Sequence, residues 1–144
     1  MAKNKITKIL VPINNTKNSI DGLEMAISIA KQHDAAITCV YVTSTPPRSE
    51  FGGTSSVNKA MLDDAKNALK KANDLVTKNN VKFNSKILHG DVGYAITKMA
   101  HDKKHGFNLL VIGVRKRGIV KQLFLGSVSN YIVHSAKIPV LVVK

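Results

Sequence analysis

The fold is decided by a stretch near the carboxyl end of the chain, Val111–Asn130, which reads VIGVRKRGIVKQLFLGSVSN. It opens with an apolar run that ends at Gly113, as a buried strand does where it enters a turn. It closes with Gly126 and Ser127 ahead of a short helical pattern, and the start of a helix offers free N–H groups to an anion. This is the layout of a phosphate-binding loop, although the cationic run Arg115–Arg117 stands where such loops usually carry glycine.

The same glycines also fit a plainer interpretation, in which Gly113 and Gly126 only form turns and Ser127 only caps a helix. Glycine patterns of this kind have many false positives. The spacing alone therefore leaves both interpretations open.

Strands and helices alternate along the rest of the chain. Apolar, β-branched runs predict strands, and the one at residues 81–88 alternates as a strand near a sheet edge does. Apolar residues at helical spacing predict helices between them. The predicted strands are Lys5–Ile13, Ala35–Thr43, Val81–Leu88, Asn108–Gly113 and Pro139–Val143. The predicted helices are one capped by Asn15 or Thr16 that includes Ile20 to Ala30, then Val57–Lys78, Val92–Lys104 and Phe124–Ala136.

This alternation predicts an α/β fold in which an open parallel sheet of five strands carries helices on both faces. The crossovers of such a sheet are right-handed. Ligands of these folds bind at the carboxyl ends of the strands, where the strand order reverses. With no internal repeat and no linker that divides the chain, residues 1–144 are predicted to form a single domain.

The composition of the chain narrows its partners and its compartment. The net charge of +13, from 22 Lys and Arg against 9 Asp and Glu, suits either an anionic partner or simply a solvated basic surface. Cys39 is the single cysteine, so no disulfide forms within the chain, and its apolar surroundings predict an inert core residue. No apolar run has the length of a membrane span, and the amino terminus lacks a signal-type segment, so we expect a cytoplasmic protein without membrane contact.

Three segments resemble one family over nearly the whole chain. They are ILVPI at Ile9–Ile13, HGDVGYAI at His89–Ile96, and the long run Ile112–Val143. In these segments the chain resembles the universal stress protein family. The resemblance implies a Rossmann-like sheet with strand order 3-2-1-4-5.

Members of this family that bind ATP share a glycine pattern: Gly, two residues, Gly, nine residues, Gly, then Ser or Thr. Gly113 matches the first glycine, and Gly126 with Ser127 matches the last pair. The second glycine falls on Lys116, which departs from the pattern. A second departure lies at the first strand: ATP-binding members usually have an Asp after the VPI segment, and this chain has Asn14.

The resemblance implies a pocket for an adenine nucleotide, ATP with or without Mg²⁺. In that pocket Val42 and Ile112 would pack against adenine, while the start of the last helix would hold phosphates. The positions that match the pocket are Pro12, Asn14, Val42, Ile112, Gly113, Lys116, Gly126, Ser127, Val128 and Ser129.

Lys116 leaves two outcomes open. Its side chain either blocks the approach of a phosphate or, with its arginine neighbours, replaces the lost backbone contacts with positive charge. The predicted function is accordingly an ATP-binding protein of the stress response. The alternative is a nucleotide-free family member that acts as a dimeric protein-interaction module. A nucleic-acid-binding function is the weakest hypothesis, because few aromatic residues accompany the lysines and no recognised motif is present.

No catalytic or metal-binding residues are predicted. The chain has no Ser-His-Asp arrangement and no GxxxxGK[ST] loop, so any hydrolysis of ATP would be slow and incidental. His101 and His105 stand four apart on a predicted helix, a spacing that suits a metal. No third ligand with suitable spacing follows them, which favours a solvated helix end.

The last strand, Pro139–Val143, bears on assembly. It is apolar and lies at a predicted sheet edge, and an open edge is a template for pairing. Members of the family commonly form homodimers through this strand. We therefore expect a homodimer with twofold symmetry.

Overall fold

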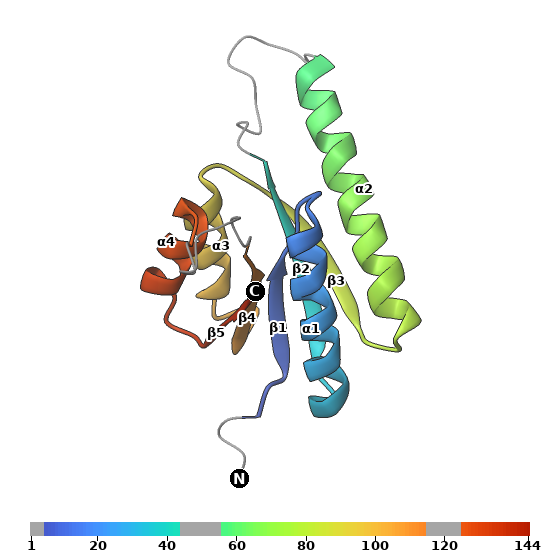
Figure 1. Ribbon diagram of the computed structural model, residues 1–144, viewed down its shortest axis with the longest axis vertical. Coiled ribbons are helices and arrows are strands. Elements are labelled where there is room, and N and C mark those ends of the chain that lie inside the picture. The colour runs from blue at the N-terminus through green and yellow to red at the C-terminus, as the bar shows by residue number, and fades with distance from the viewer. Residues whose placement is uncertain (1–4, 44–55, 115–124) are drawn as a thin grey trace.

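A computed structural model describes residues 5–43, 56–114 and 125–144, and these form a five-stranded parallel sheet between two layers of helices (Figure 1). The strand order is β3-β2-β1-β4-β5, and each neighbouring pair is parallel. The predicted fold class and strand order are therefore confirmed. The strands are β1 (Lys8–Pro12), β2 (Ala36–Thr43), β3 (Phe83–His89), β4 (Leu109–Gly113) and β5 (Val140–Val143).

Two helices cover each face of the sheet, as predicted (Figure 1). Successive strand residues point to opposite faces, so each strand supplies both cores. Ile9 and Cys39 belong to the core beneath α1 and α2, whereas Leu10 and Val40 belong to the core beneath α3 and α4. The helices are α1 (Lys17–His33), α2 (Ser56–Lys78), α3 (Val92–Ala100) and α4 (Ser127–Ser135).

The helix α3 ends four residues earlier than the predicted boundary at Lys104. His101 is its C-cap, and a turn follows in which the carboxylate of Asp102 accepts a hydrogen bond from the Lys104 N–H (2.9 Å). The side chain of His101 accepts a hydrogen bond from the Lys137 N–H (2.9 Å), while His105 stacks on Phe107. The two histidines thus serve separate structural contacts and do not share a helical face.

Cys39 is fully buried on β2, in agreement with the prediction of a core residue. Burial raises the pKa of its thiol, because the apolar surroundings disfavour the charged thiolate. The thiol is therefore an apolar packing group in this core. Across the ranges that the structure covers, no helix has both the length and the apolar character needed to cross a membrane.

The strand order places a topological switch in the middle of the sheet. From β1 the chain first proceeds to β2 and β3 on one side, and then to β4 and β5 on the other. The helix that follows β1, α1, covers one face of the sheet, whereas the helix that follows β4, α4, covers the other. Open α/β sheets form their ligand crevices at such a point.

Candidate functional site

A cavity of about 360 Å³ lies at this switch point, a volume in the range of small-molecule pockets. It is bounded by the carboxyl ends of β1, β2 and β4, by the first turn of α1, and by residues of α3 and α4. None of the described residues that line it is charged. They are Pro12, Ile13, Asn14, Thr16, Asn18, Ser19, Val40, Tyr41, Val42, Val92, Ile96, Ile112, Gly113, Val128, Ser129 and Ile132.

Most residues predicted for the nucleotide pocket lie on this one cavity. Gly126 and Ser127 lie just outside its lining, at the start of α4. Lys116 falls outside the described residues. The predicted residues that line the cavity are Pro12, Asn14, Val42, Ile112, Gly113, Val128 and Ser129.

Asn14 presents a hydrogen-bond donor to the cavity. Its side-chain oxygen accepts from the main-chain N–H of Thr16 (2.9 Å) and from the Thr16 hydroxyl. The amide cannot be reversed, because a main-chain N–H only donates. The group left for a ligand is therefore the amide nitrogen. An Asp at this position would make the same contacts with one oxygen and present a charged acceptor with the other.

Val42 supplies a main-chain donor and acceptor to the same cavity. The main-chain groups of alternate β2 residues point toward β1: the Ala36 N–H donates to the Thr7 carbonyl (2.9 Å), and the Val40 carbonyl accepts from the Ile13 N–H (2.8 Å). The register of β1 with β2 ends at Val40. Val42 lies two residues further, so its N–H and C=O point into the space beyond the end of β1.

Gly113 is required by helix packing. A Cβ placed on Gly113 would lie 1.8 Å from the Asn18 carbonyl oxygen on α1. On the facing helix, a Cβ on Gly22 would lie 2.9 Å from the Gly113 nitrogen. The two glycines let the backbones of α1 and β4 approach closely. Helix packing thus accounts for Gly113 without a ligand, so this glycine does not by itself indicate a phosphate-binding loop.

Gly126 has no comparable packing reason. A Cβ there would meet nothing within 4 Å, and its φ of −64° suits any residue. Gly126 is the N-cap of α4, and no side chain caps that helix end. The N-cap therefore supplies no side-chain acceptor to the first N–H groups of α4, beside a cavity that has no negative charge in its described lining. An anion is the chemical group that this helix end favours.

Several cavity residues escaped the sequence analysis. Tyr41 adjoins the predicted Val42 at the end of β2, and Val92 begins α3 directly after the turn that follows β3. Asn18 and Ser19 come from the first turn of α1, where the Ser19 hydroxyl lies 2.8 Å from the Asn14 carbonyl oxygen. The sequence could have indicated them only by position, because each lies near the carboxyl end of a strand or at the start of the helix that follows a strand.

Metal chemistry finds no support in the described residues. Within them, no group of three His, Cys, Asp or Glu side chains is arranged to hold an ion. His89 lies outside the cavity lining, and its Nδ1 is 2.7 Å from the Thr43 hydroxyl. It therefore links the ends of β2 and β3.

Comparison with known proteins identifies relatives over the whole length of the chain. The sequence model of the universal stress protein family matches residues 5–144. A universal stress protein of Methanocaldococcus jannaschii is 29% identical over 145 residues, which cover 99% of this chain and 84% of that protein. A universal stress protein of Bacillus subtilis is 28% identical, covering 95% of this chain and 98% of the relative.

Solved structures share the fold. A universal stress protein in complex with cAMP superposes with a TM-score of 0.75 at 25% identity, over 97% of this chain and 98% of that chain. A universal stress protein of Archaeoglobus fulgidus in complex with dAMP gives 0.74 at 19% identity, over 97% and 99%. A family protein of Arabidopsis thaliana with AMP bound gives 0.71 at 19% identity, over 96% and 91%.

Proposed function

Because the chain belongs to the universal stress protein family, we propose that it is a cytoplasmic, regulatory protein of the stress response that binds an adenine nucleotide. The observation that carries the proposal is the meeting, at one cavity whose described lining is uncharged, of the Val42 main-chain pair and the start of α4, which has no N-cap side chain. The first recognises a base and the second an anion. A nucleotide is the small molecule that joins both.

Adenine fits the Val42 pair chemically. Its edge places an acceptor nitrogen beside an amino donor, which complements an adjacent N–H and C=O. The apolar side chains of Val40, Ile96 and Ile112 offer the flat ring a dry surface. Guanine would present a carbonyl where adenine presents its amine, and would leave the Val42 carbonyl unpaired.

The phosphates then extend toward α4. Ser129 lines the cavity, and Gly126 and Ser127 open the helix. ATP with Mg²⁺ is the fuller form of the proposal, in which Lys116 would add positive charge. Family proteins whose structures contain AMP, cAMP or dAMP support adenine nucleotides as a class.

The proposed role is that of a binding switch without enzymatic turnover. A ligand that binds only the folded state stabilises it in proportion to its concentration relative to the dissociation constant. A change in nucleotide concentration would thereby change the stability or the surface of the protein.

The cavity is tested by filling it from α4. Val128 lines the cavity and is 36% exposed, whereas Val133, on the same helix, is 38% exposed and does not line it. We expect Val128→Phe to weaken AMP and ATP binding about tenfold or more, because the ring occupies ligand space. The matched control Val133→Phe should bind as the unmodified protein does, and both variants should keep their stability within about 0.5 kcal/mol.

Mass spectrometry first shows whether the denatured protein releases a nucleotide. Calorimetric titration then measures the affinity of each variant for AMP and ATP. An unmodified protein that releases no nucleotide and gives no heat with ATP–Mg²⁺ or AMP contradicts the proposal. That result favours the alternative of a nucleotide-free dimeric interaction module. Such a protein would still need Gly113, because the packing of α1 against β4 requires glycine there.

We also propose that two copies pair through β5. The carbonyls of Pro139 and Val143 accept hydrogen bonds from the N–H groups of Leu110 and Val114. The main-chain groups of odd-numbered residues in this segment therefore face β4. Val142 therefore directs its N–H and C=O outward from the edge. Pairing across a twofold axis would join the two sheets and cover the half-buried valines.

Val142→Pro tests this interface. Proline removes an outward N–H while leaving the pairing with β4 intact, which edge strands tolerate. We expect the dimer dissociation constant to rise about tenfold or more, as measured by sedimentation equilibrium, since both copies lose a hydrogen bond at the symmetric contact. An unchanged constant would place the dimer contact elsewhere.

A further inference from the structure

The outer edge of β3 is unpaired in the described structure. All seven residues of β3 are in register with β2 on one side, and no described strand lies on the other. The Ile37 N–H donates to the Lys82 carbonyl and the Gly90 N–H donates to the Thr43 carbonyl, each at 2.9 Å, so even-numbered residues face β2. The main-chain N–H and C=O groups of the odd-numbered residues therefore face outward, and these are Phe83, Ser85, Ile87 and, at the end of the strand, His89.

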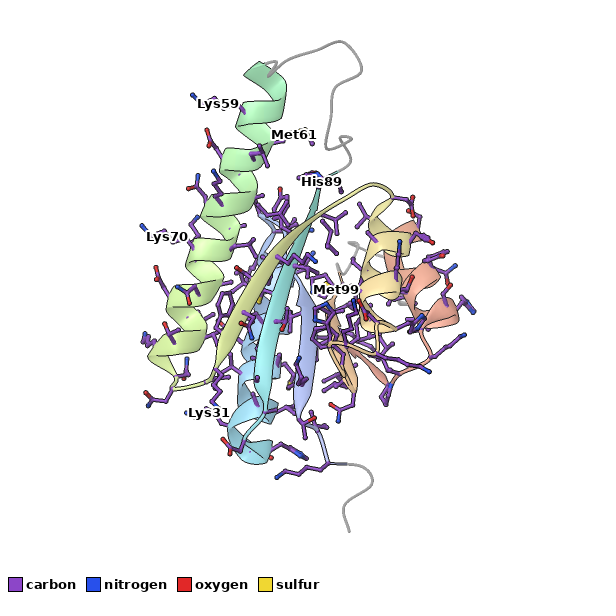
Figure 2. All side chains as sticks on the ribbon, turned by 180° about the vertical axis from the view of Figure 1, so that it is seen from behind. Lys31, Lys59, Met61, Lys70, His89 and Met99 are labelled. Atoms are coloured by element: carbon purple, nitrogen blue, oxygen red, sulfur yellow. The ribbon has the colours of Figure 1, made fainter. Side chains whose placement is uncertain are left out.

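Two grooves flank this edge, one on each face of the sheet. A groove of about 670 Å³ lies between β3 and α2 and includes Lys66 and Lys70. A groove of about 430 Å³ lies between β3 and α3 and includes Lys98. Lys86 of β3 belongs to both. In Figure 2, β3 runs between α2, which carries the labelled Lys70, and α3, which carries the labelled Met99.

The two grooves differ in charge. The described lining of the α2-side groove contains lysines and no carboxylate. On the α3 side, the carboxylates of Asp91 and Asp102 accept hydrogen bonds from the main-chain N–H groups of Tyr94 (3.0 Å) and Lys104 (2.9 Å). The α3-side groove therefore sets two carboxylates against Lys86 and Lys98, whose charges they balance. The α2-side groove is positive, and its lysines are exposed.

We propose that the β3 edge binds an acidic peptide segment of a partner protein, which adds to the sheet as a sixth strand. Main-chain hydrogen bonds to Phe83, Ser85 and Ile87 would supply affinity, as in other cases of strand addition. Side chains of an added strand alternate between the two faces. Carboxylates on the face toward α2 would then meet Lys66 and Lys70, whereas uncharged side chains such as Thr and Val would lie toward the α3-side groove.

The same features disfavour two other occupants. A second copy of this chain would bring one set of lysines against another, and like charges across paired edges repel. A nucleic acid would satisfy the lysines through its phosphates. It would, however, set those acceptors against the outward carbonyls of β3, which need donors. An acidic peptide supplies both the carboxylates and the N–H groups.

The experiment uses the full chain and a fluorescein-labelled peptide of roughly twelve residues in which Glu alternates with Thr and Val. Anisotropy gives its dissociation constant. Lys66→Glu/Lys70→Glu and Ser85→Pro should each weaken binding about tenfold or more, the first by charge and the second by removing an outward N–H. The charge-matched control Lys17→Glu/Lys31→Glu, on α1, should change the constant less than about threefold.

A second arm keeps the test decisive if Ser85→Pro does not fold. The same peptide with alternate backbone nitrogens methylated should lose binding, and the unmethylated peptide should slow hydrogen exchange at the amides of Phe83, Ser85 and Ile87. Methylated peptide that binds equally well, or exchange that stays unchanged, overturns strand addition. Oligouridylate that protects the same amides more strongly, or self-association of the chain lost in Ser85→Pro, overturns the choice of occupant.

Discussion

Replacing Gly113 with alanine is expected to destabilise the protein by about 3 kcal/mol or more, the upper range for overpacking. The added Cβ would lie 1.8 Å from the carbonyl oxygen of Asn18, a main-chain atom of α1. Neither partner can rotate away, because one belongs to a central strand and the other to a helix. Relief requires α1 and β4 to separate, which opens the core between them.

Urea denaturation followed by circular dichroism measures this loss. Gly126→Ala is the matched control, since a Cβ at Gly126 meets nothing within 4 Å. It should cost no more than about 1 kcal/mol, the loss of a good N-cap residue. Equal midpoints for Gly113→Ala and the unmodified protein would contradict the close approach of α1 to β4.

The fold was predictable because its signals are local. Apolar runs such as NLLVIG and the helical spacing between them predict the alternation of strands and helices, and alternation predicts a parallel sheet. The polar alternation at residues 81–88 also indicated the edge position that β3 occupies. The end of α3 was less predictable, because the sequence after Ala100 contains no glycine or proline until Gly106. The turn at Asp102 depends instead on a side-chain hydrogen bond.

The site was predictable in position but not in the reasons for its residues. The contact that requires Gly113 joins it to Asn18, far away in sequence, so spacing could not separate packing from ligand binding. For Asn14 the sequence showed an amide with both donors and acceptors. Only the folded turn shows that Thr16 occupies the oxygen and leaves the donors for a ligand.

Gly126→Asp should weaken nucleotide binding and stabilise the protein at the same time. Asp is a favoured N-cap residue, and the extended backbone of Gly126 suits it. Its carboxylate would accept from the N–H groups of the first turn of α4 and interact favourably with the helix dipole, adding about 0.5–1 kcal/mol of stability. The proposed phosphate would lose those donors and face a negative charge, so we expect the dissociation constant of AMP or ATP to rise about 30-fold or more.

Calorimetry and urea denaturation on the same samples measure the two effects, and their opposite signs make the result specific. A variant that binds poorly because it is damaged would also be less stable. Gly126→Asn separates the causes: it caps the helix without charge, so it should weaken binding less than Asp does. Nucleotide that binds Gly126→Asp as tightly as the unmodified protein would mean that the phosphates do not meet the start of α4. The anion would then have to be held by residues elsewhere in the cavity.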